Sequence, residues 1–243
     1  LDAQILEKAR WEDIHLAELE LKIRKSTIFA KDESPFLMGC DGGQSCPENQ
    51  IGRHTVTIST DLVAMTTEVT QELYESVMQS KGPSDDTCIP TNEGLEFPVV
   101  CINWADAMAF FSELNHALGL DNCDDPALYL ECEGWRLPTE AEWEYLARSG
   151  KNYLYSGGNT PEEVGWFKET EETKEKSASD GPPVSNIYPV RQRKHNTFGL
   201  YDMSGNVWEW CLDGWSLYSV TSQRDPLFNL DSDTGVLRGG SAN

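Results

Sequence analysis

The stretch GLYDMSGNVWEW, residues 199–210, places two glycines, two acidic residues and two tryptophans within twelve positions. Gly199 and Gly205 permit turn conformations, or a close backbone approach, that a side chain would block. Trp208 and Trp210 lie on the same side of an extended segment, and their large rings are expected to bury much apolar area. The stretch therefore predicts a domain that builds its core from turns and aromatic rings rather than from many long strands.

The two acidic residues of this stretch allow two interpretations. Asp202 and Glu209, with carbonyl oxygens of the turn between them, have the hard-oxygen chemistry that calcium prefers. Alternatively, Asp202 caps the turn and Glu209 pairs with a basic residue such as Arg136. The residues alone leave both interpretations open.

Composition and charge limit the classes of partner. The chain has 243 residues, 39% of them hydrophobic, which is enough for a sizeable core in one large or two small domains. A formal net charge of -22, from 41 acidic and 19 basic residues, repels phosphate backbones, so we expect no nucleic-acid partner. No apolar run reaches the roughly 18 residues that a membrane span requires. Divalent cations, basic partners and neutral sugars remain open.

Six of the seven cysteines fall into locally spaced pairs. Each pair would close a short loop that contains Gly, Pro, Asp or Asn, a pattern typical of disulfides in an oxidising compartment. The predicted pairs are Cys40 with Cys46, Cys88 with Cys101, and Cys123 with Cys132. The alternative is a set of free buried thiols in a cytosolic protein. The disulfide interpretation places the protein outside the cytosol, as a secreted, periplasmic or cell-surface protein, and leaves Cys211 unpaired.

Three segments carry helix start signals. Thr70 precedes the apolar stripe of residues 71–78, and Asn103 precedes residues 104–118, which Gly119 ends. Thr139 and Glu142 form a capping box at the start of a third helix.

The rest of the chain predicts an α+β domain. Residues 54–59 alternate like a strand, and the second half is rich in turns, with a charged loop at residues 168–183. We expect residues 1–30 to form an amino-terminal leader or edge segment and residues 31–243 to form one domain.

Several motifs together resemble the formylglycine-generating enzyme, or sulfatase-modifying factor, family. They are RLPTEAEWEYLAR (136–148), NTFGLYDMSGNVWEW (196–210) and LRGGS (237–241), with FLMG (36–39), EVTQELYESVM (68–78) and FPVVCINWADAMAFFSELN (97–115) before them. The resemblance covers residues 36–241. It implies an elaborated C-type lectin-like fold of the sulfatase-modifying-factor type, with two or three helices, short antiparallel strands and little regular secondary structure.

The resemblance also implies a structural calcium site. Carried over to this sequence, its ligands are the side chains of Asp202 and Glu209 and the main-chain carbonyls of Gly205 and Val207. A second calcium site of such enzymes would fall at residues 164–179, where no matching ligands are found.

The oxidase chemistry of the family depends on two cysteines that bind copper(I), for which thiolates are suitable ligands. In those enzymes the pair follows the Arg-Gly-Gly-Ser motif, which here is residues 238–241. Copper is therefore expected only if such cysteines lie beyond residue 243, and no catalytic residue is assigned within the chain. The domain is expected to be truncated at its carboxyl-terminal end.

Three functions follow as hypotheses. The first is a secreted binding or structural module without oxidase activity, with a protein or carbohydrate ligand. Its expected ligand-binding surface includes Trp215, Tyr218 and residues 223–235. The second is a formylglycine-generating oxidase that uses copper to oxidise a substrate protein cysteine, with its own catalytic cysteines beyond residue 243. The third is a subunit of an extracellular assembly.

Overall fold

The computed structural model describes residues 16–30, 35–40, 52–83, 93–123, 125, 128–167, 187–230 and 235–242. Within them lie seven strands and four labelled helices, preceded by a helical segment at residues 16–22. In chain order the labelled elements are β1 (Lys25–Ile28), β2 (Phe36–Met38), β3 (His54–Thr57), β4 (Leu62–Met65), α2 (Gln71–Met78), α3 (Trp104–Leu118), α4 (Glu140–Arg148), α5 (Pro161–Val164), β5 (Glu209–Gly214), β6 (Gln223–Arg224) and β7 (Gly235–Arg238).

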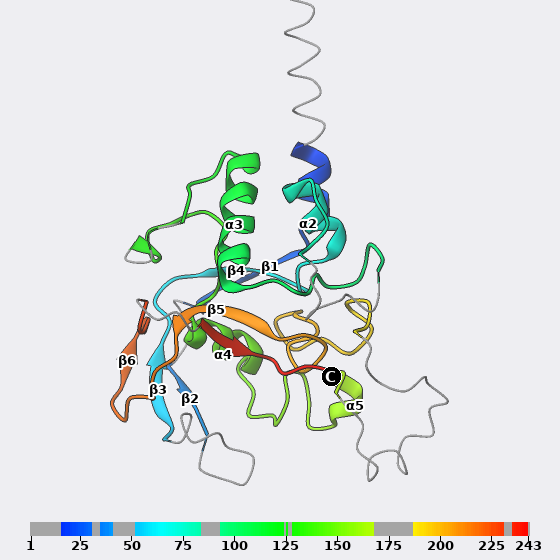
Figure 1. Cartoon of the computed structure of the whole chain (residues 1–243). Helices are drawn as coiled ribbons and strands as arrows, with labels where there is room; N and C mark the ends of the chain where they lie inside the picture. The colour runs from blue at the N-terminus through cyan, green and yellow to red at the C-terminus, as the bar shows by residue number, and fades with distance from the viewer. Residues whose placement is uncertain are drawn as a thin grey trace, which may run out of the picture.

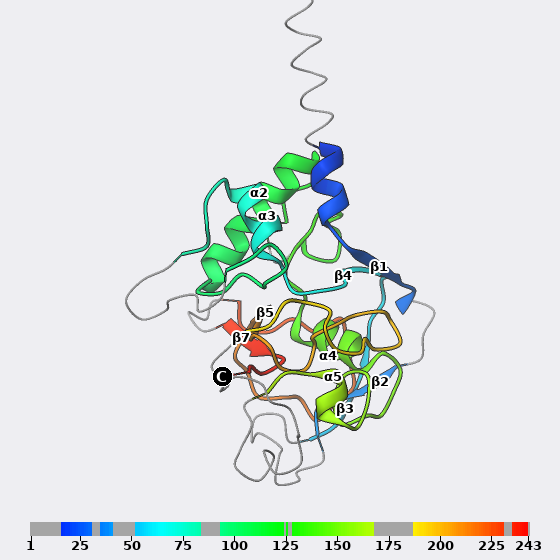
Figure 2. The ribbon, with the colours of Figure 1, turned by 90° about the vertical axis from the view of Figure 1, so that its right-hand side faces the viewer.

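The molecule has two layers (Figure 1). The upper layer holds α2, α3 and the 16–22 helix, with the antiparallel pair β1 and β4 beneath them (Figure 2). The lower layer is built around α4, which contacts β2, β5 and β7. There, β2, β3 and β6 form one small sheet, and β5 pairs antiparallel with β7 in another. The α+β architecture with short strands expected from the sequence is confirmed.

The predicted helix starts are also confirmed. Thr70 accepts a hydrogen bond from the amide of Leu73 at the start of α2. Capping boxes begin both longer helices, formed by Asn103 with Asp106 and by Thr139 with Glu142. At the end of α4 the cap residue is Ser149, which has a left-handed backbone conformation.

Each layer has its own apolar cluster. In the upper layer Leu19 and Ile23 pack with Leu73, Phe110 and Leu114 of α2 and α3. In the lower layer α4 packs against residues from β2, β3, β5 and β7. Residues 16–30 thus contribute buried side chains to both layers, whereas residues 1–15 lie outside the described part of the chain.

Candidate functional site

The turn at residues 202–206 is built from left-handed backbone. Asp202, Gly205 and Asn206 have φ values of 58°, 90° and 60°. A Cβ at Gly205 would overlap the carbonyl oxygen of Trp166, so this glycine is required for close backbone approach, as its sequence context predicts. The amide of Gly205 donates to the carbonyl of Gly239, which ties the turn to the Arg-Gly-Gly-Ser segment.

Asn206 anchors the turn from within. Its side chain is fully buried, accepts from the amide of Tyr188 and donates to Oε2 of Glu68 at 2.7 Å. The other oxygen of Glu68 accepts from the amide of Val207 at 3.1 Å. Glu68 comes from the segment before α2, so the turn is fixed to a residue 138 positions away in the sequence.

Three carboxylates therefore meet around this turn. Burial, and then the negative charges of Asp202 and Glu209, raise the pKa of Glu68 well above its ordinary value. Burial is the main cause that raises the pKa of Glu209 to about 7, against a hydrogen bond of 2.8 Å from the indole of Trp143. Burial also raises the pKa of Asp202, whose Oδ2 accepts from the amide of Arg191 at 2.7 Å. No arginine or lysine side chain offsets this cluster in the hydrogen bonds and ion pairs of the described residues.

The geometry supports some requirements of a cation site. Oδ1 of Asp202 is buried and has no hydrogen-bond partner. The carbonyl oxygen of Val207 and Oε1 of Glu209 both lie near Gly239, since a Cβ built on this glycine would be 3.5 Å and 3.6 Å from them. The described residues contain no group of three His, Cys, Asp or Glu side chains arranged to hold a metal. A cation here would therefore need main-chain oxygens besides the carboxylates, as the predicted ligand set has them.

The alternative prediction, an ion pair between Glu209 and Arg136, is wrong. Arg136 instead forms a two-pronged ion pair with Glu142, with both nitrogen–oxygen distances at 2.8 Å. Glu142 is three residues into α4 and attracts Arg136 at short range.

The role expected for Trp208 also needs correction. Its side chain is 55% exposed, whereas Trp210 is partly buried and donates its indole N–H to the carbonyl of Ile102. Only one of the two rings therefore contributes its area to the core.

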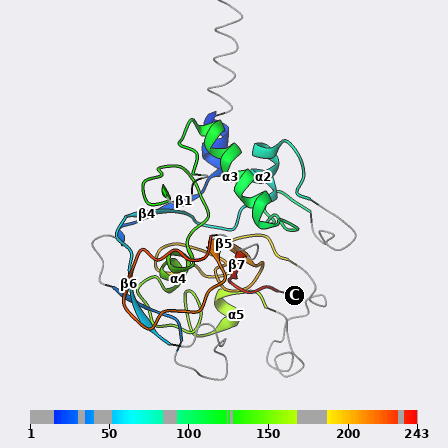
Figure 3. The ribbon, with the colours of Figure 1, turned by 60° about the vertical axis from the view of Figure 1, so that its left-hand side comes forward.

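A cleft of about 1370 Å³ lies between the two layers. Its lining residues come from β4, α3, α4, the loop before α4 and the segment that contains the turn. Figure 3 shows how the backbones of β4, α3 and α4 are arranged. Exposed Trp208 and Leu237 line it, together with Ser241 of the Arg-Gly-Gly-Ser motif. Glu68 and Glu209 also line this cleft, which connects it to the carboxylate cluster.

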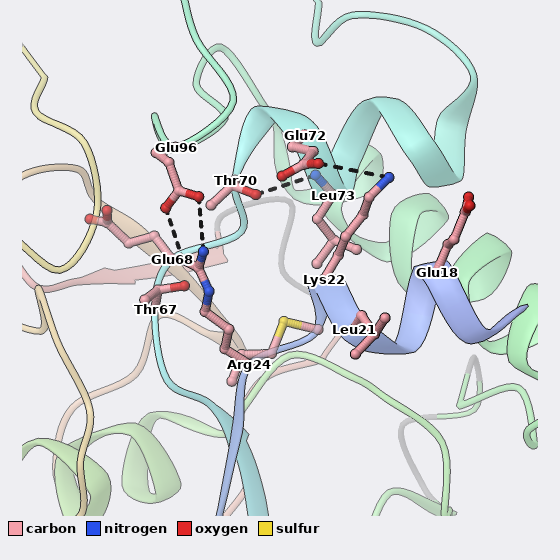
Figure 4. A pocket seen from close by; sticks show the side chains of 11 residues that line it. Glu18, Leu21, Lys22, Arg24, Thr67, Glu68, Thr70, Glu72, Leu73 and Glu96 are labelled. Carbon is pink, nitrogen blue, oxygen red and sulfur yellow. Dashed lines mark hydrogen bonds and ion pairs between the residues drawn. The ribbon is translucent and has the colours of Figure 1, made fainter. Parts of the chain in front are cut away.

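A smaller pocket of about 400 Å³ lies between the 16–22 helix and α2. Figure 4 shows Arg24 and Glu96 in a two-pronged ion pair on one side of it, with nitrogen–oxygen distances of 2.9 Å and 2.8 Å. On the other side Lys22 lies 3.9 Å from Glu72. Arg24, Glu96, Lys22 and Glu72 thus pair with one another, while Glu68 of the carboxylate cluster also lines this pocket.

The predicted ligand-binding residues differ from each other. Trp215 is 52% exposed, in line with a surface role. The hydroxyl of Tyr218 donates to Glu140 and accepts from Arg238, so it is used inside the protein and is not presented to a ligand. Of residues 223–235, positions 231–234 lie outside the described residues.

The cysteines of the described residues are disulfide-bonded or buried. Cys123 and Cys132 form a disulfide, one of the three predicted pairs. Cys40 and Cys101 are also disulfide-bonded, while Cys46 and Cys88 lie outside the described residues. Cys211 is free and fully buried, and burial raises the pKa of its thiol.

Glu68 and Asn206 are the site residues that sequence reasoning missed. Both lie within quoted motifs, but no local pattern indicates that two segments so far apart share a hydrogen bond.

Among the described residues, no helix is long and apolar enough to cross a membrane.

The chain is similar in sequence to proteins that are named as a chaperone, as an inactive enzyme and as an enzyme. The chain is 45% identical over 98 residues to the chaperone protein LppX of Paenibacillus barcinonensis, covering 37% of this chain and 35% of the relative. It is 35% identical over 154 residues to the inactive C-alpha-formylglycine-generating enzyme 2 of Bos taurus, covering 61% and 40%. It is 35% identical over 139 residues to the formylglycine-generating enzyme of Streptomyces coelicolor, covering 52% and 42%. The chain thus spans less than half the length of these relatives.

Solved structures show the same fold. The variable protein 1 of Treponema denticola superposes with a TM-score of 0.70 at 28% identity, over 90% of this chain and 83% of that protein. PvdO from Pseudomonas aeruginosa superposes with a TM-score of 0.66 at 22% identity, over 90% and 82%, and supports the fold alone. The family described as sulfatase-modifying factor enzyme 1-like domain matches residues 30–243. The chain therefore belongs to the sulfatase-modifying factor enzyme 1-like domain family.

Proposed function

We propose that this domain is a secreted ligand-binding module whose ligand enters the cleft between the two layers. The observation that carries the proposal is the cleft itself, at about 1370 Å³, with exposed Trp208 and Leu237 in its wall. Pockets for small molecules commonly measure about 300–1,000 Å³. The larger volume and the aromatic and aliphatic walls favour an extended polypeptide segment as the occupant.

Among the described residues, the cysteines supply no thiolate pair for the family's copper(I) chemistry. Copper(I) chemistry of the family's kind needs two accessible thiolates, and Cys211 is fully buried with a raised thiol pKa. Cys40, Cys101, Cys123 and Cys132 are held in disulfides and supply no thiolate. Disulfides in turn support an oxidising compartment, which is the basis for proposing secretion. One relative at 35% identity is itself named an inactive enzyme.

The rival proposal is a formylglycine-generating oxidase. Two observations favour it, since relatives carry that name and Ser241 of the Arg-Gly-Gly-Ser motif lines the cleft. Incubating the natively produced protein with copper(I), dioxygen, a thiol reductant that supplies the other two electrons for the reduction of dioxygen to water, and a cysteine-containing peptide separates the two. Mass spectra that show the cysteine converted to an aldehyde would establish the oxidase, and unchanged peptide would support the binding module.

Peptide binding can be tested directly. Peptides selected from a displayed random library on the immobilised domain would be labelled, and their affinities measured by fluorescence polarisation. Trp208→Ala is expected to weaken binding by at least about tenfold, as truncation of an interface tryptophan commonly does. The matched control is Trp215→Ala, because the two side chains are 55% and 52% exposed. If Trp215→Ala alone weakens binding, the ligand uses the surface expected from the sequence, and the cleft is excluded.

We also propose that the turn at residues 202–209 holds a structural calcium ion. Asp202 and Glu209 would bind it with their carboxylates, and Gly205 and Val207 with their carbonyls. The buried, unpartnered Oδ1 of Asp202 and the position of Val207 O and Glu209 Oε1, both beside Gly239, support this ligand set. When bound, the ion would offset the charge of the buried carboxylates and fix the turn that borders the cleft.

A further inference from the structure

Residues 191–195, here called the basic turn, concentrate positive charge in an acidic protein. Its sequence is Arg-Gln-Arg-Lys-His, in a chain with a net charge of -22. Backbone hydrogen bonds fix the basic turn at both ends, from the amide of Arg191 to Asp202 and from the amide of Lys194 to the carbonyl of Glu163 in α5. The charges are therefore held on an ordered piece of backbone.

Arg193 forms one end of a column of stacked groups. Its guanidinium carbon lies 3.6 Å from the ring centroid of Trp166. On the same indole, Tyr188 stacks at 3.7 Å with an interplanar angle of 8°. Stacking holds the guanidinium by its face and leaves the edge, which carries the N–H donors, for hydrogen bonds.

Two donors in this column have no acceptor. Nε of Arg193 and Nε1 of Trp166 are buried and make no hydrogen bond. Both groups can only donate, and a buried donor without a partner is unfavourable because its hydration is lost and not replaced. Two such donors on stacked neighbours point to an acceptor that belongs beside the stack, at the edges that carry the N–H groups.

The charges of the basic turn are also unpaired. Among the described residues, Arg191, Arg193 and Lys194 form no salt bridge, although the chain has 41 acidic residues. Instead Arg191 packs over the ring of Tyr201 at 5.3 Å, as Arg193 packs over Trp166. The charge of Arg191 helps to lower the pKa of Glu96, after the contribution of Arg24, whereas Arg193 is supported by the ring of Trp166.

We propose that the Arg193–Trp166 stack is a binding site for an oxyanion group of a ligand, either a carboxylate or a tetrahedral sulfate or phosphate. The guanidinium edge offers a fork of donors that matches such groups, the indole N–H supplies a further donor, and Lys194 adds charge nearby. Repulsion from the acidic surface is screened beyond about 8 Å at physiological ionic strength, so the local donors decide binding. None of these residues lines the cleft, so the site does not depend on the proposed function.

The test is a nuclear magnetic resonance titration of the ¹⁵N-labelled protein with sodium phosphate, sodium sulfate and sodium acetate, at constant ionic strength. The probes are the indole N–H of Trp166, assigned with Trp166→Phe, and the Nε–H of Arg193. The expected result is a saturable shift of both signals. Saturation by phosphate or sulfate identifies a tetrahedral oxyanion, and saturation by acetate at lower concentration identifies a carboxylate.

Two variants decide whether the shift reports this site. Arg193→Gln should weaken the response of Trp166 at least about tenfold, because the charged fork is lost. Arg224→Gln removes the same charge from a side chain that is 70% exposed and lies outside the stack, and it should leave the response unchanged. If Arg193→Gln alters the whole spectrum, Arg193→Lys takes its place in the test, because lysine keeps the charge and loses only the forked donor geometry. The absence of a saturable shift with every anion, or equal responses in both glutamine variants, would overturn the proposal.

Discussion

Two groups of buried acidic side chains lie next to each other and are stabilised differently. Three glutamates of α4 have arginine partners: Glu140 with Arg238, Glu142 with Arg136, and Glu144 with Arg148 and Arg238. The carboxylates around the turn are those of Asp202, Glu209 and Glu68. Within the described part of the chain they accept hydrogen bonds from backbone amides, an indole and an amide side chain, and none has an arginine partner.

The pKa values follow this difference. Burial raises the pKa of Glu144, but the charges of Arg238 and Arg148 outweigh it and leave the pKa below its ordinary value. Glu209 has no such partner, and burial raises its pKa to about 7. The arginine-paired group is therefore complete as a structural network, whereas the turn lacks a positive charge, which is the property expected of a cation site.

The largest effect is expected from breaking the arginine-paired group. Arg238→Met would leave Glu140 and Glu144 buried with a partner missing, at a cost of about 3–5 kcal/mol in the free energy of unfolding. Urea denaturation measures this loss. The matched control, Arg224→Gln, removes an exposed arginine and should change stability by about 0.5 kcal/mol or less. Equal costs for the two variants would show that the network contributes no more than a surface charge.

Asp213 is another buried acidic side chain, and it tests the comparison through the pH dependence of stability. It is 1% exposed and accepts hydrogen bonds from the amides of Glu140 and Phe228, and burial raises its pKa to about 7. Because the folded state holds this proton more tightly than the unfolded state, the contribution of Asp213 to stability is fully present at low pH and is lost as pH rises through about 7. The contribution to the loss is about 3–4 kcal/mol between pH 4 and pH 8.

Asp213→Asn should remove that contribution to the pH dependence. Denaturation midpoints of both proteins at a series of pH values, in the presence of a chelator, provide the measurement. Parallel curves for the two proteins would mean that Asp213 is ionised in the folded state across this range, contrary to the account.

A smaller effect is expected at the start of α4. Thr139 caps the helix that carries the three paired glutamates, and Thr139→Ala should lower the free energy of unfolding by about 1–2 kcal/mol. Thr139→Ser keeps the capping oxygen and should recover most of the loss. The same denaturation assay measures both, and a serine variant as unstable as the alanine variant would assign the effect to packing rather than to the cap.

The smallest effect is expected for the ion pair at the edge of the small pocket (Figure 4). Arg24 and Glu96 have the same two-pronged geometry as Arg136 and Glu142, but their side chains are 35% and 49% exposed. Arg24→Gln should therefore cost about 0.2–1 kcal/mol, and less at high salt. A cost as large as that of Arg238→Met would contradict the claim that burial, rather than geometry, separates these pairs.

Features that depend on signals from neighbouring residues, such as the helix starts, could be predicted from the sequence. The caps at Thr70, Asn103 and Thr139 act within three or four residues, so the helix starts could be located before the structure was available. The close approach at Gly205 was also predicted, because a glycine in a turn constrains its own backbone.

Long-range contacts were not predicted. The partner of Glu209 is Trp143, 66 positions away, and Glu68 reaches Asn206 across 138 positions. The pairing of Arg136 with the nearby Glu142, and the exposure of Trp208, depend on how the layers pack, which no short pattern encodes.

The most direct test of the account is a calorimetric titration of the metal-free protein with calcium. The account predicts one ion per chain, an increase in the thermal unfolding midpoint on binding, and loss of both in Asp202→Asn and in Glu209→Gln. Glu144→Gln, in the arginine-paired group, should leave calcium binding intact at temperatures where the variant remains folded. No calcium binding by the folded wild-type protein, or equal binding by Asp202→Asn, would contradict the claim that the turn holds a calcium ion.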